Sequence, residues 1–267
     1  MSRKTSKAIF DFCQGSTPLL VSVPHAGTAI PERIATKLTQ QARVVPDTDW
    51  YVDRLYRFVE DIGGSMIVAN YSRTVVDLNR PSTSESLYPG QNTTGLIPTA
   101  LFTGDPVYQE GKEPTPDQMQ ERIRKYWEPY HNAIRTELDR LRKEHGRAML
   151  WDAHSILSEV PWLFDGKLPD MNLGTNDGKS CDPALAAAVE AVAAKSDYSH
   201  VLNGRFKGGF ITRNYGDPEN NIHAIQLELC QSAYMNEDKP RTFRVDLAEQ
   251  VRPVIRGMLE TMIGWGG

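Results

Sequence analysis

Two histidines and an arginine stand at the ends of three short apolar runs in this chain. His25 follows the run 19–23, His154 follows the run 148–151, and Arg80 closes a third run of the same kind. Imidazole nitrogens bind transition metals, and the guanidinium group of arginine binds carboxylates through two parallel hydrogen bonds. The three residues therefore predict a site that combines a metal ion with an acidic ligand.

The candidate carboxylate ligand for such a metal is Asp49, which we place in the first turn of a helix. Two imidazoles and one carboxylate, with a fourth position open, form the ligand set of hydrolytic zinc sites. Asp53 lies one turn further along the same helix face and is an alternative ligand, while Asp152 is placed to orient His154. Each histidine alone is more often a capping or packing residue, and Asp49 alone more often a helix cap. Only the combination points to a metal.

The string 71–81 carries Arg73, Asp77, Asn79 and Arg80 within a few positions of one another. Two arginines that flank one buried strand, with an amide beside them, suit a substrate that bears carboxylate groups. Such a site can bind an acidic ligand in an acidic protein, because the local field governs binding. The alternative is a structural ion pair between Asp77 and an arginine.

Glu228 lies in the middle of an apolar run, on the same predicted strand face as Gln226. A buried glutamate without a partner is costly, so it is either paired, for instance with an arginine, or kept for proton transfer. Desolvation raises the pKa of a carboxyl group toward the range that is useful in general acid–base catalysis. Glu228 is therefore a candidate catalytic residue, with a structural pair as the alternative.

Composition excludes several classes of function. The chain has 267 residues, enough for one large α/β domain over 1–267, and it shows no internal repeat and no linker. A net charge of -4 and the lack of a dense Lys/Arg stripe argue against nucleic acid as a partner. The apolar stretch near the N-terminus is too short for a membrane span. The 3 widely spaced cysteines indicate neither a disulfide framework nor a cysteine zinc site, so we expect a cytoplasmic protein.

The elements that must position these residues alternate between strands and helices. Short β-branched runs predict strands over 19–23, 65–69, 74–78, 148–151 and 224–229. Caps and helical spacing predict helices over 47–62, 115–145 with a kink at Pro129, 183–196, and 246–263 with a kink at Pro253. This alternation predicts an α/β fold, in which ligands bind beyond the carboxyl ends of the strands.

Two stretches are predicted to be irregular. The polar, glycine-flanked stretch 207–216 indicates a loop or an edge hairpin. The stretch 80–115 is rich in Pro, Gly, Ser and Thr, and a loop of this length inside a domain is either functional or misread. We interpret 82–114 as a candidate lid over the site.

The motifs together resemble one family, the N-formylglutamate amidohydrolases or N-formylglutamate deformylases. The resemblance rests on Val23-Pro24-His25-Ala26-Gly27, Asp47-Thr48-Asp49-Trp50, Ser72-Arg73, Asp77-Leu78-Asn79-Arg80-Pro81, Trp151-Asp152-Ala153-His154-Ser155 and Gln226-Leu227-Glu228. Each motif is weak alone, but the ordered set, from His25 to about Tyr234, is highly specific. The family is similar to zinc carboxypeptidases and aspartoacylases. The resemblance therefore implies a three-layer α/β/α fold with a central mixed sheet, of the phosphorylase/hydrolase-like (zinc carboxypeptidase-like) type.

The resemblance implies one zinc ion per chain, bound by His25, Asp49 and His154. The wider superfamily usually takes its carboxylate ligand from a short His-x-x-Glu motif, whereas here Thr28 stands three residues after His25. The assignment of Asp49 over Asp53 therefore rests on the pattern of the narrower family.

The resemblance also implies roles for the remaining candidates. Asn79 and Arg80 would hold one substrate carboxylate, and Arg213 would hold the second. Arg73 would polarise the scissile carbonyl, and Glu228 would activate the zinc-bound water.

The implied reaction is zinc-dependent hydrolysis of N-formyl-L-glutamate to formate and L-glutamate, in histidine degradation. An amidohydrolase for N-formyl- or N-acetyl-aspartate is the nearest alternative, and a carboxypeptidase acting on peptides is a further one. A non-catalytic carboxylate-binding protein on the same fold is an alternative of another class. Glu228 argues against it, because a binding protein has little use for a lone buried acid. The oligomeric state stays open.

Overall fold

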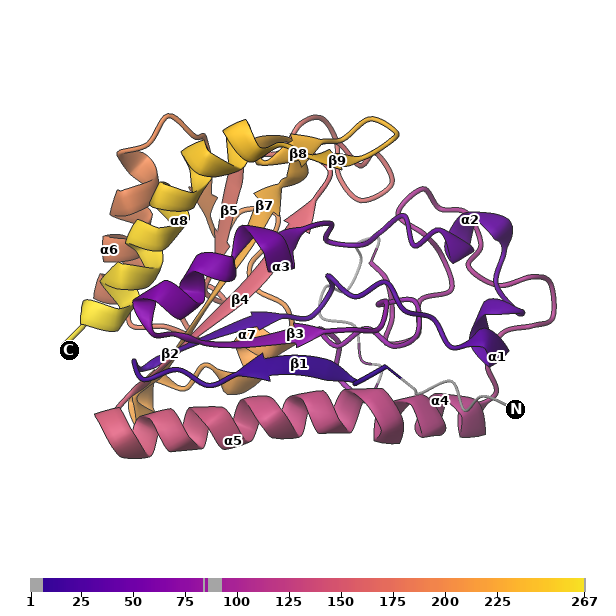
Figure 1. Cartoon of the computed structure of the whole chain (residues 1–267), viewed down its shortest axis with the longest axis horizontal. Coiled ribbons are helices and arrows are strands. Elements are labelled where there is room, and N and C mark those ends of the chain that lie inside the picture. The colour runs from indigo at the N-terminus through magenta and orange to yellow at the C-terminus, as the bar shows by residue number, and fades with distance from the viewer. Residues whose placement is uncertain (1–6, 84, 86–92, 267) are drawn as a thin grey trace.

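A seven-stranded mixed sheet forms the centre of the computed structural model, which describes residues 7–83, 85 and 93–266 (Figure 1). The strands stand in the order β1-β3-β2-β4-β7-β5-β6. Their bounds are β1 Phe10–Cys13, β2 Leu19–Val23, β3 Ser65–Ala69, β4 Ala148–Ile156, β5 Met171–Gly174, β6 His200–Leu202 and β7 Ile222–Cys230. The central strands β3, β2, β4 and β7 run parallel, while β1 and β5 pair antiparallel with their neighbours β3 and β7. A separate pair joins β8 (Met235–Asn236) to β9 (Thr242–Phe243).

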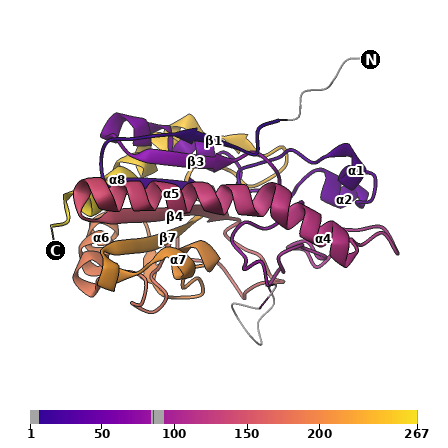
Figure 2. The same ribbon diagram turned by 90° about the horizontal axis from the view of Figure 1, so that it is seen from below.

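Helices cover both faces of this sheet, which makes the predicted three-layer α/β/α arrangement (Figure 2). The helices α4 (Pro116–Arg122), α5 (Glu128–His145) and α7 (Phe210–Tyr215) lie on one face. The helices α3 (Val52–Leu55), α6 (Pro183–Ala194) and α8 (Val245–Gly264) lie on the other. The short helices α1 (Glu32–Ala35) and α2 (Gln40–Arg43) lie at the end of the molecule near α4 (Figure 1).

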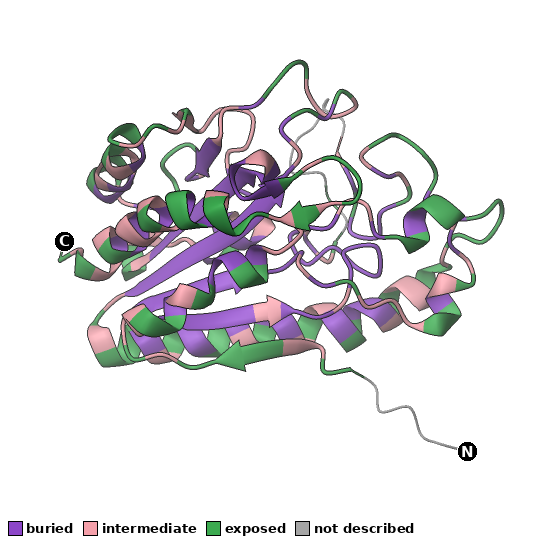
Figure 3. Ribbon diagram, turned by 45° about the horizontal axis from the view of Figure 1, so that its top comes forward, coloured by how far each residue is buried: buried purple, intermediate pink, exposed green. Residues whose placement is uncertain are grey.

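Alternation along the central strands builds a separate apolar core on each face. In β2, Leu19 and Val21 pack toward α6 and α8, whereas Leu20 packs toward α5. All nine residues of β4 are buried, so this strand has no solvated face (Figure 3). The polar side chains of β4 therefore lie inside the protein, where each needs a partner.

The long predicted helix over 115–145 is confirmed, with an interruption near Pro129. Thr115 caps α4 through a capping box with Gln118, and Pro116 occupies the first turn. A π-helical turn over 123–127 joins α4 to α5 directly before Pro129. Such a turn is a known way to accommodate a break in the hydrogen-bond ladder of a helix. The helices predicted over 183–196 and 246–263 correspond to α6 and α8, and Pro253 lies inside α8.

The strand predicted over 148–151 is longer than expected, because β4 continues to Ile156. His154 therefore lies within the strand and pairs in register with Glu228 of β7. The polar residues Asp152 and His154 interrupt the apolar pattern, so the sequence signal stops early. These two residues lie on the same strand face as Leu150, which packs toward α5.

The strand predicted over 74–78 is wrong. This stretch forms a buried turn in which the Val75 N–H donates to Ser72 O and the Asp77 N–H donates to Leu96 O. Its β-branched residues are buried against the α4–α5 side of the core, which explains the strand-like pattern. The two arginines of this string therefore flank a buried turn.

The helix predicted over 47–62 starts later than expected. Tyr51 adopts a left-handed conformation with φ 62°, and α3 begins at Val52. A 3₁₀-helix, Arg57–Ile62, follows and ends at Gly63 as predicted. Asp49 lies before the helix, with its N–H donating to His25 O, so Asp49 and Asp53 share no helix face.

The loop or hairpin predicted over 207–216 is also wrong, because the stretch contains the helix α7. The lid predicted over 82–114 includes residue 84 and residues 86–92, which lie outside the described residues, and it stays a prediction. The described part from 93 onward contributes core residues such as Leu96 and Val107. Within the described part of the chain, no helix combines the length and the hydropathy needed to span a lipid bilayer.

His131 of α5 ties the buried turn to the helical layer. Its Nε2 lies 2.9 Å from Leu78 O, its Nδ1 lies 2.9 Å from the Tyr215 hydroxyl, and its ring stacks on Trp127 at 3.8 Å between centroids. Leu78 O can only accept, so Nε2 donates to it, and the Tyr215 hydroxyl donates to the backbone oxygen of His131 at 3.0 Å. Burial lowers the pKa of His131 to about 3.

This shift predicts a loss of stability in acid. Below pH 6.5 the unfolded chain protonates His131 while the folded protein does not, so stability falls as pH decreases toward 3. Between pH 7 and pH 5, in chelator, the free energy of unfolding should fall by about 2 kcal/mol more in the wild type than in His131→Gln. Urea unfolding at both pH values measures this difference. Equal losses in the two proteins would show that His131 does not contribute.

Candidate active site

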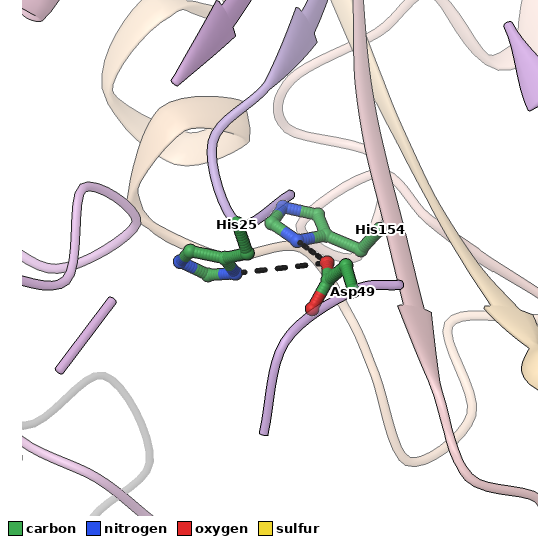
Figure 4. A group of neighbouring side chains, drawn as sticks. All are labelled: His25, Asp49 and His154. Carbon is green, nitrogen blue, oxygen red and sulfur yellow. Dashed lines mark hydrogen bonds and ion pairs between the residues drawn. The ribbon is translucent and has the colours of Figure 1, made fainter. Parts of the chain in front are cut away.

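The structure brings His25, Asp49 and His154 together at the carboxyl ends of the central strands (Figure 4). His25 follows β2, His154 lies on β4, and Asp49 lies on the segment that precedes α3. One potential ligand atom from each residue lies within 4.8 Å of the others, and all three side chains are buried. Asp49 Oδ2 is 3.1 Å from His154 Nδ1 and 3.7 Å from His25 Nδ1. Asp53 is exposed and does not belong to this cluster.

Each imidazole in the cluster is held from behind by a buried carboxylate. His25 Nε2 lies 2.7 Å from Asp77 Oδ1, and His154 Nε2 lies 3.0 Å from Asp152 Oδ2. An Nε2–H that donates to a carboxylate leaves the Nδ1 lone pair pointing to the centre of the cluster, which is how metal-binding histidines are usually oriented. Asp77 was predicted only as a partner of arginine, so its contact with His25 went unseen in the sequence.

The residues present fit a metal ion. His25 Nδ1 is buried and has no hydrogen-bond partner among the described residues. A buried polar atom of this kind is costly unless a ligand satisfies it. Two imidazole nitrogens and a carboxylate oxygen form a donor set that suits zinc and similar divalent metals.

The charges in the cluster also favour a cation. Burial opposes the ionisation of Asp49, but the hydrogen bond from His154 and the charge of His25 outweigh it, so the pKa of Asp49 is lowered. Burial, together with the charge of Arg73, lowers the pKa of His25 below its usual value. Burial disfavours the charged form of His154 as well, yet Asp152 and Asp49 raise its pKa well above the usual value. A metal must therefore displace a proton from His154.

Glu228 lies beside this cluster on the neighbouring strand. His154 and Glu228 are register partners in the parallel pair β4–β7, and their side chains line one cavity. Burial raises the pKa of Glu228 to about 8, and the nearby charge of His154 limits that rise. A carboxyl group whose pKa lies near neutrality suits proton transfer at physiological pH.

Arg73 forms the structural ion pair with Asp77 and also lies at the cavity, so both interpretations of the sequence apply to it. Its Nη2 donates to Asp77 Oδ2 at 2.6 Å, so the structural ion pair exists. The guanidinium group nevertheless lines the cavity, and its Nε is buried with no hydrogen-bond partner among the residues described. Because Asp77 also contacts His25, one carboxylate connects Arg73 to the His25–Asp49–His154 cluster.

The side-chain amide of Asn79 makes hydrogen bonds to other residues of the protein. Its Nδ2 donates to Asp152 Oδ2 at 3.2 Å and lies 2.8 Å from His154 Nε2, while its Oδ1 accepts from the Ile211 N–H at the start of α7. A Cβ at Gly209 would fall 2.2 Å from Asn79 Nδ2, so the glycine lets α7 approach the amide. Asn79 thus connects the cluster to α7 and also forms part of the cavity lining.

The two predicted carboxylate anchors differ in position. Arg80 lines the cavity and is held by the carbonyl oxygens of Thr94 and Asn79 at 2.7 and 2.9 Å. Arg213 lies on α7, donates from Nε to Gly208 O at 2.8 Å, and is not among the residues that line the cavity. Arg205 lines it instead, which no pattern in the sequence indicated.

Comparisons with known proteins agree on one family. The sequence model described as N-formylglutamate amidohydrolase matches residues 17–235, a range that includes every candidate residue. The N-formylglutamate deformylase of Pseudomonas aeruginosa is 54% identical over 259 residues, which are 97% of each protein, and that of Pseudomonas putida is 52% identical over the same share. A crystal structure of N-formylglutamate amidohydrolase from Ralstonia eutropha JMP134 superposes with a TM-score of 0.82, at 24% identity over 96% of this chain and 98% of that chain. At that identity the superposition supports the fold alone.

Proposed function

The chain belongs to the N-formylglutamate amidohydrolase family, and from this premise we propose that it hydrolyses N-formyl-L-glutamate to formate and L-glutamate. The observation that carries the proposal is one cavity lined by His25 and His154 of the His–His–Asp cluster, by the buried Glu228 and by arginine side chains. The space of this cavity and its mouth, open solvent included, is about 590 Å³. Cytoplasmic residence and a place in histidine degradation stay expectations.

In this proposal His25, Asp49 and His154 hold one Zn²⁺ ion. The metal, when bound, lowers the pKa of water and polarises a carbonyl oxygen. Asp77 and Asp152 keep the two imidazoles in the tautomer that presents Nδ1 to the cluster.

Glu228 performs the proton transfers. Its carboxylate takes a proton from the water whose oxygen attacks the formyl carbon, and the carboxylic acid then gives that proton to the amide nitrogen. The C–N bond breaks as the nitrogen leaves as an amine. Burial brings the pKa of Glu228 to about 8, so the group exchanges protons readily near neutral pH.

Arg73 stabilises the negative charge that develops on the formyl oxygen. Asp77 holds the Nη2 of its guanidinium group, and the buried Nε is a donor with no hydrogen-bond partner among the described residues. A preorganised donor of this kind typically contributes about 10²- to 10³-fold in rate. Arg80 holds a substrate carboxylate and so fixes the orientation of the amide.

Formate release tests the proposal directly. Protein loaded with zinc should release formate from N-formyl-L-glutamate, lose activity in chelator, and regain it when zinc is restored. A coupled formate assay measures each step. Zinc-loaded protein that releases no formate would refute the proposed reaction.

A substrate panel separates the nearest alternatives. We expect the highest kcat/KM for N-formyl-L-glutamate among the N-formyl and N-acetyl derivatives of glutamate and aspartate, because kcat/KM reports transition-state discrimination. If an N-acetyl or aspartyl compound gives the highest kcat/KM, the proposed amide hydrolysis stands, but the assigned substrate is wrong. Binding of these compounds without turnover of any would favour a carboxylate-binding protein.

A further inference from the structure

Arg205 forms part of the cavity wall and has no role in the catalytic steps above. It lies in the segment 203–209 between β6 and α7, and it lines the same cavity as His154 and Glu228. Its Nε and Nη2 donate to Leu163 O at 3.4 and 3.2 Å, and its Cζ lies 5.3 Å from the centre of the Phe206 ring. These contacts hold the guanidinium group against the wall.

Arg80 and Arg205 reach the same cavity from two different connections of the sheet. Arg80 belongs to the segment that follows β3, and Arg205 belongs to the segment that follows β6. Both arginines line the cavity together with His154 and Glu228, so a ligand bound there has two guanidinium groups from separate segments within the same cavity.

The wall near Arg205 is apolar up to the guanidinium group. Ile156, Leu163 and Phe206 line the cavity there and belong to one small apolar cluster. Apolar side chains favour the burial of methylene groups, and a guanidinium group favours a carboxylate. This wall therefore suits an aliphatic chain that ends in an acid.

We propose that Arg205 determines specificity by binding the side-chain carboxylate of an acidic N-formyl amino acid, while Arg80 binds the α-carboxylate. This inference rests on the proposed function. The α-carboxylate is attached to the carbon that carries the scissile nitrogen, so it must lie near the cluster, and Arg80 adjoins Asn79, whose amide contacts His154. The side-chain carboxylate lies further away, on the side of Leu163 and Phe206. Arg205 thereby takes the role that the family resemblance implied for Arg213.

Two substrate analogues test the assignment in zinc-loaded, full-length protein. N-formyl-L-glutamine lacks the side-chain carboxylate, and the α-amide of N-formyl-L-glutamate lacks the other. Arg205→Met should lower kcat/KM for N-formyl-L-glutamate and for its α-amide by about 10- to 100-fold, the effect of a lost charge-assisted hydrogen bond. It should change kcat/KM for N-formyl-L-glutamine by less than about 3-fold, because that substrate has no charge for Arg205 to bind.

Three further variants test whether the loss in Arg205→Met comes from the carboxylate contact. Arg205→Lys retains the charge without the planar fork and should fall between the wild type and Arg205→Met, which covers the case that the Met variant does not fold. Arg256→Met, at a surface arginine paired with Glu260, controls for the loss of an arginine. Equal losses of Arg205→Met on all three substrates, or a larger selective loss in Arg213→Met, would overturn the inference. Wild-type protein that turns over none of the substrates would instead refute the proposed function.

Discussion

Glu228→Gln should lower kcat for formate release by about 10²- to 10⁴-fold, the usual contribution of a general acid–base residue. The substitution keeps the shape of the side chain and removes its ability to take and return a proton. Zinc content should stay at the wild-type level, because the proposed zinc ligands are His25, Asp49 and His154. Steady-state formate assays and metal analysis of the same preparation measure both quantities.

The control for this variant is a buried glutamate elsewhere. Glu137 lies on α5, is buried, and contacts Ser65 and Arg140, away from the residues that line the cavity. Glu137→Gln makes the same chemical change and should lower stability while leaving kcat near the wild-type value. Activity of Glu228→Gln close to that of the wild type would place the base elsewhere.

The convergence of His25 and His154 could be predicted because it follows from a general property of parallel sheets. His25 follows β2 and His154 lies near the carboxyl end of β4. The two strands run in the same direction, and such strands bring their carboxyl ends to one edge. The helix expected at Asp49 was wrong, yet its position near the site was correct, because the Asp49 N–H donates to His25 O and so holds Asp49 beside the end of β2. Most members of the cluster could therefore be predicted from residue type and from their order along the chain.

What the sequence could not predict depends on contacts between distant segments. The stretch 74–78 has a strand-like composition, but its backbone bonds locally and to Leu96, so no ladder forms. The helix α7 forms in a glycine-flanked stretch that packs on Asn79, a contact about which local pattern says nothing. Arg205 reaches the cavity because its segment passes from β6 to α7, whereas Arg213, in a more familiar motif, lies on the helix outside the lining.

Asp49→Ala should weaken zinc binding by more than about 100-fold, beyond the effect of removing an outer partner of a ligand. The change removes one of the three proposed protein ligands and also the acceptor of the Ser155 N–H and the partner of His154 Nδ1. Activity should fall to that of chelator-treated wild type, because the same metal is lost. Zinc content after dialysis against a competing chelator measures the affinity, and circular dichroism verifies the fold.

Asp53→Ala is the matched control, since it deletes the alternative carboxylate from the same part of the chain. Asp53 is exposed in the first turn of α3, so its loss should leave zinc content and kcat/KM unchanged. Retention of zinc by Asp49→Ala together with its loss from Asp53→Ala would reverse the ligand assignment. Both variants remove one negative charge, but only Asp49 is buried in the cluster, so a loss of zinc confined to Asp49→Ala follows from its position and not from the change in net charge.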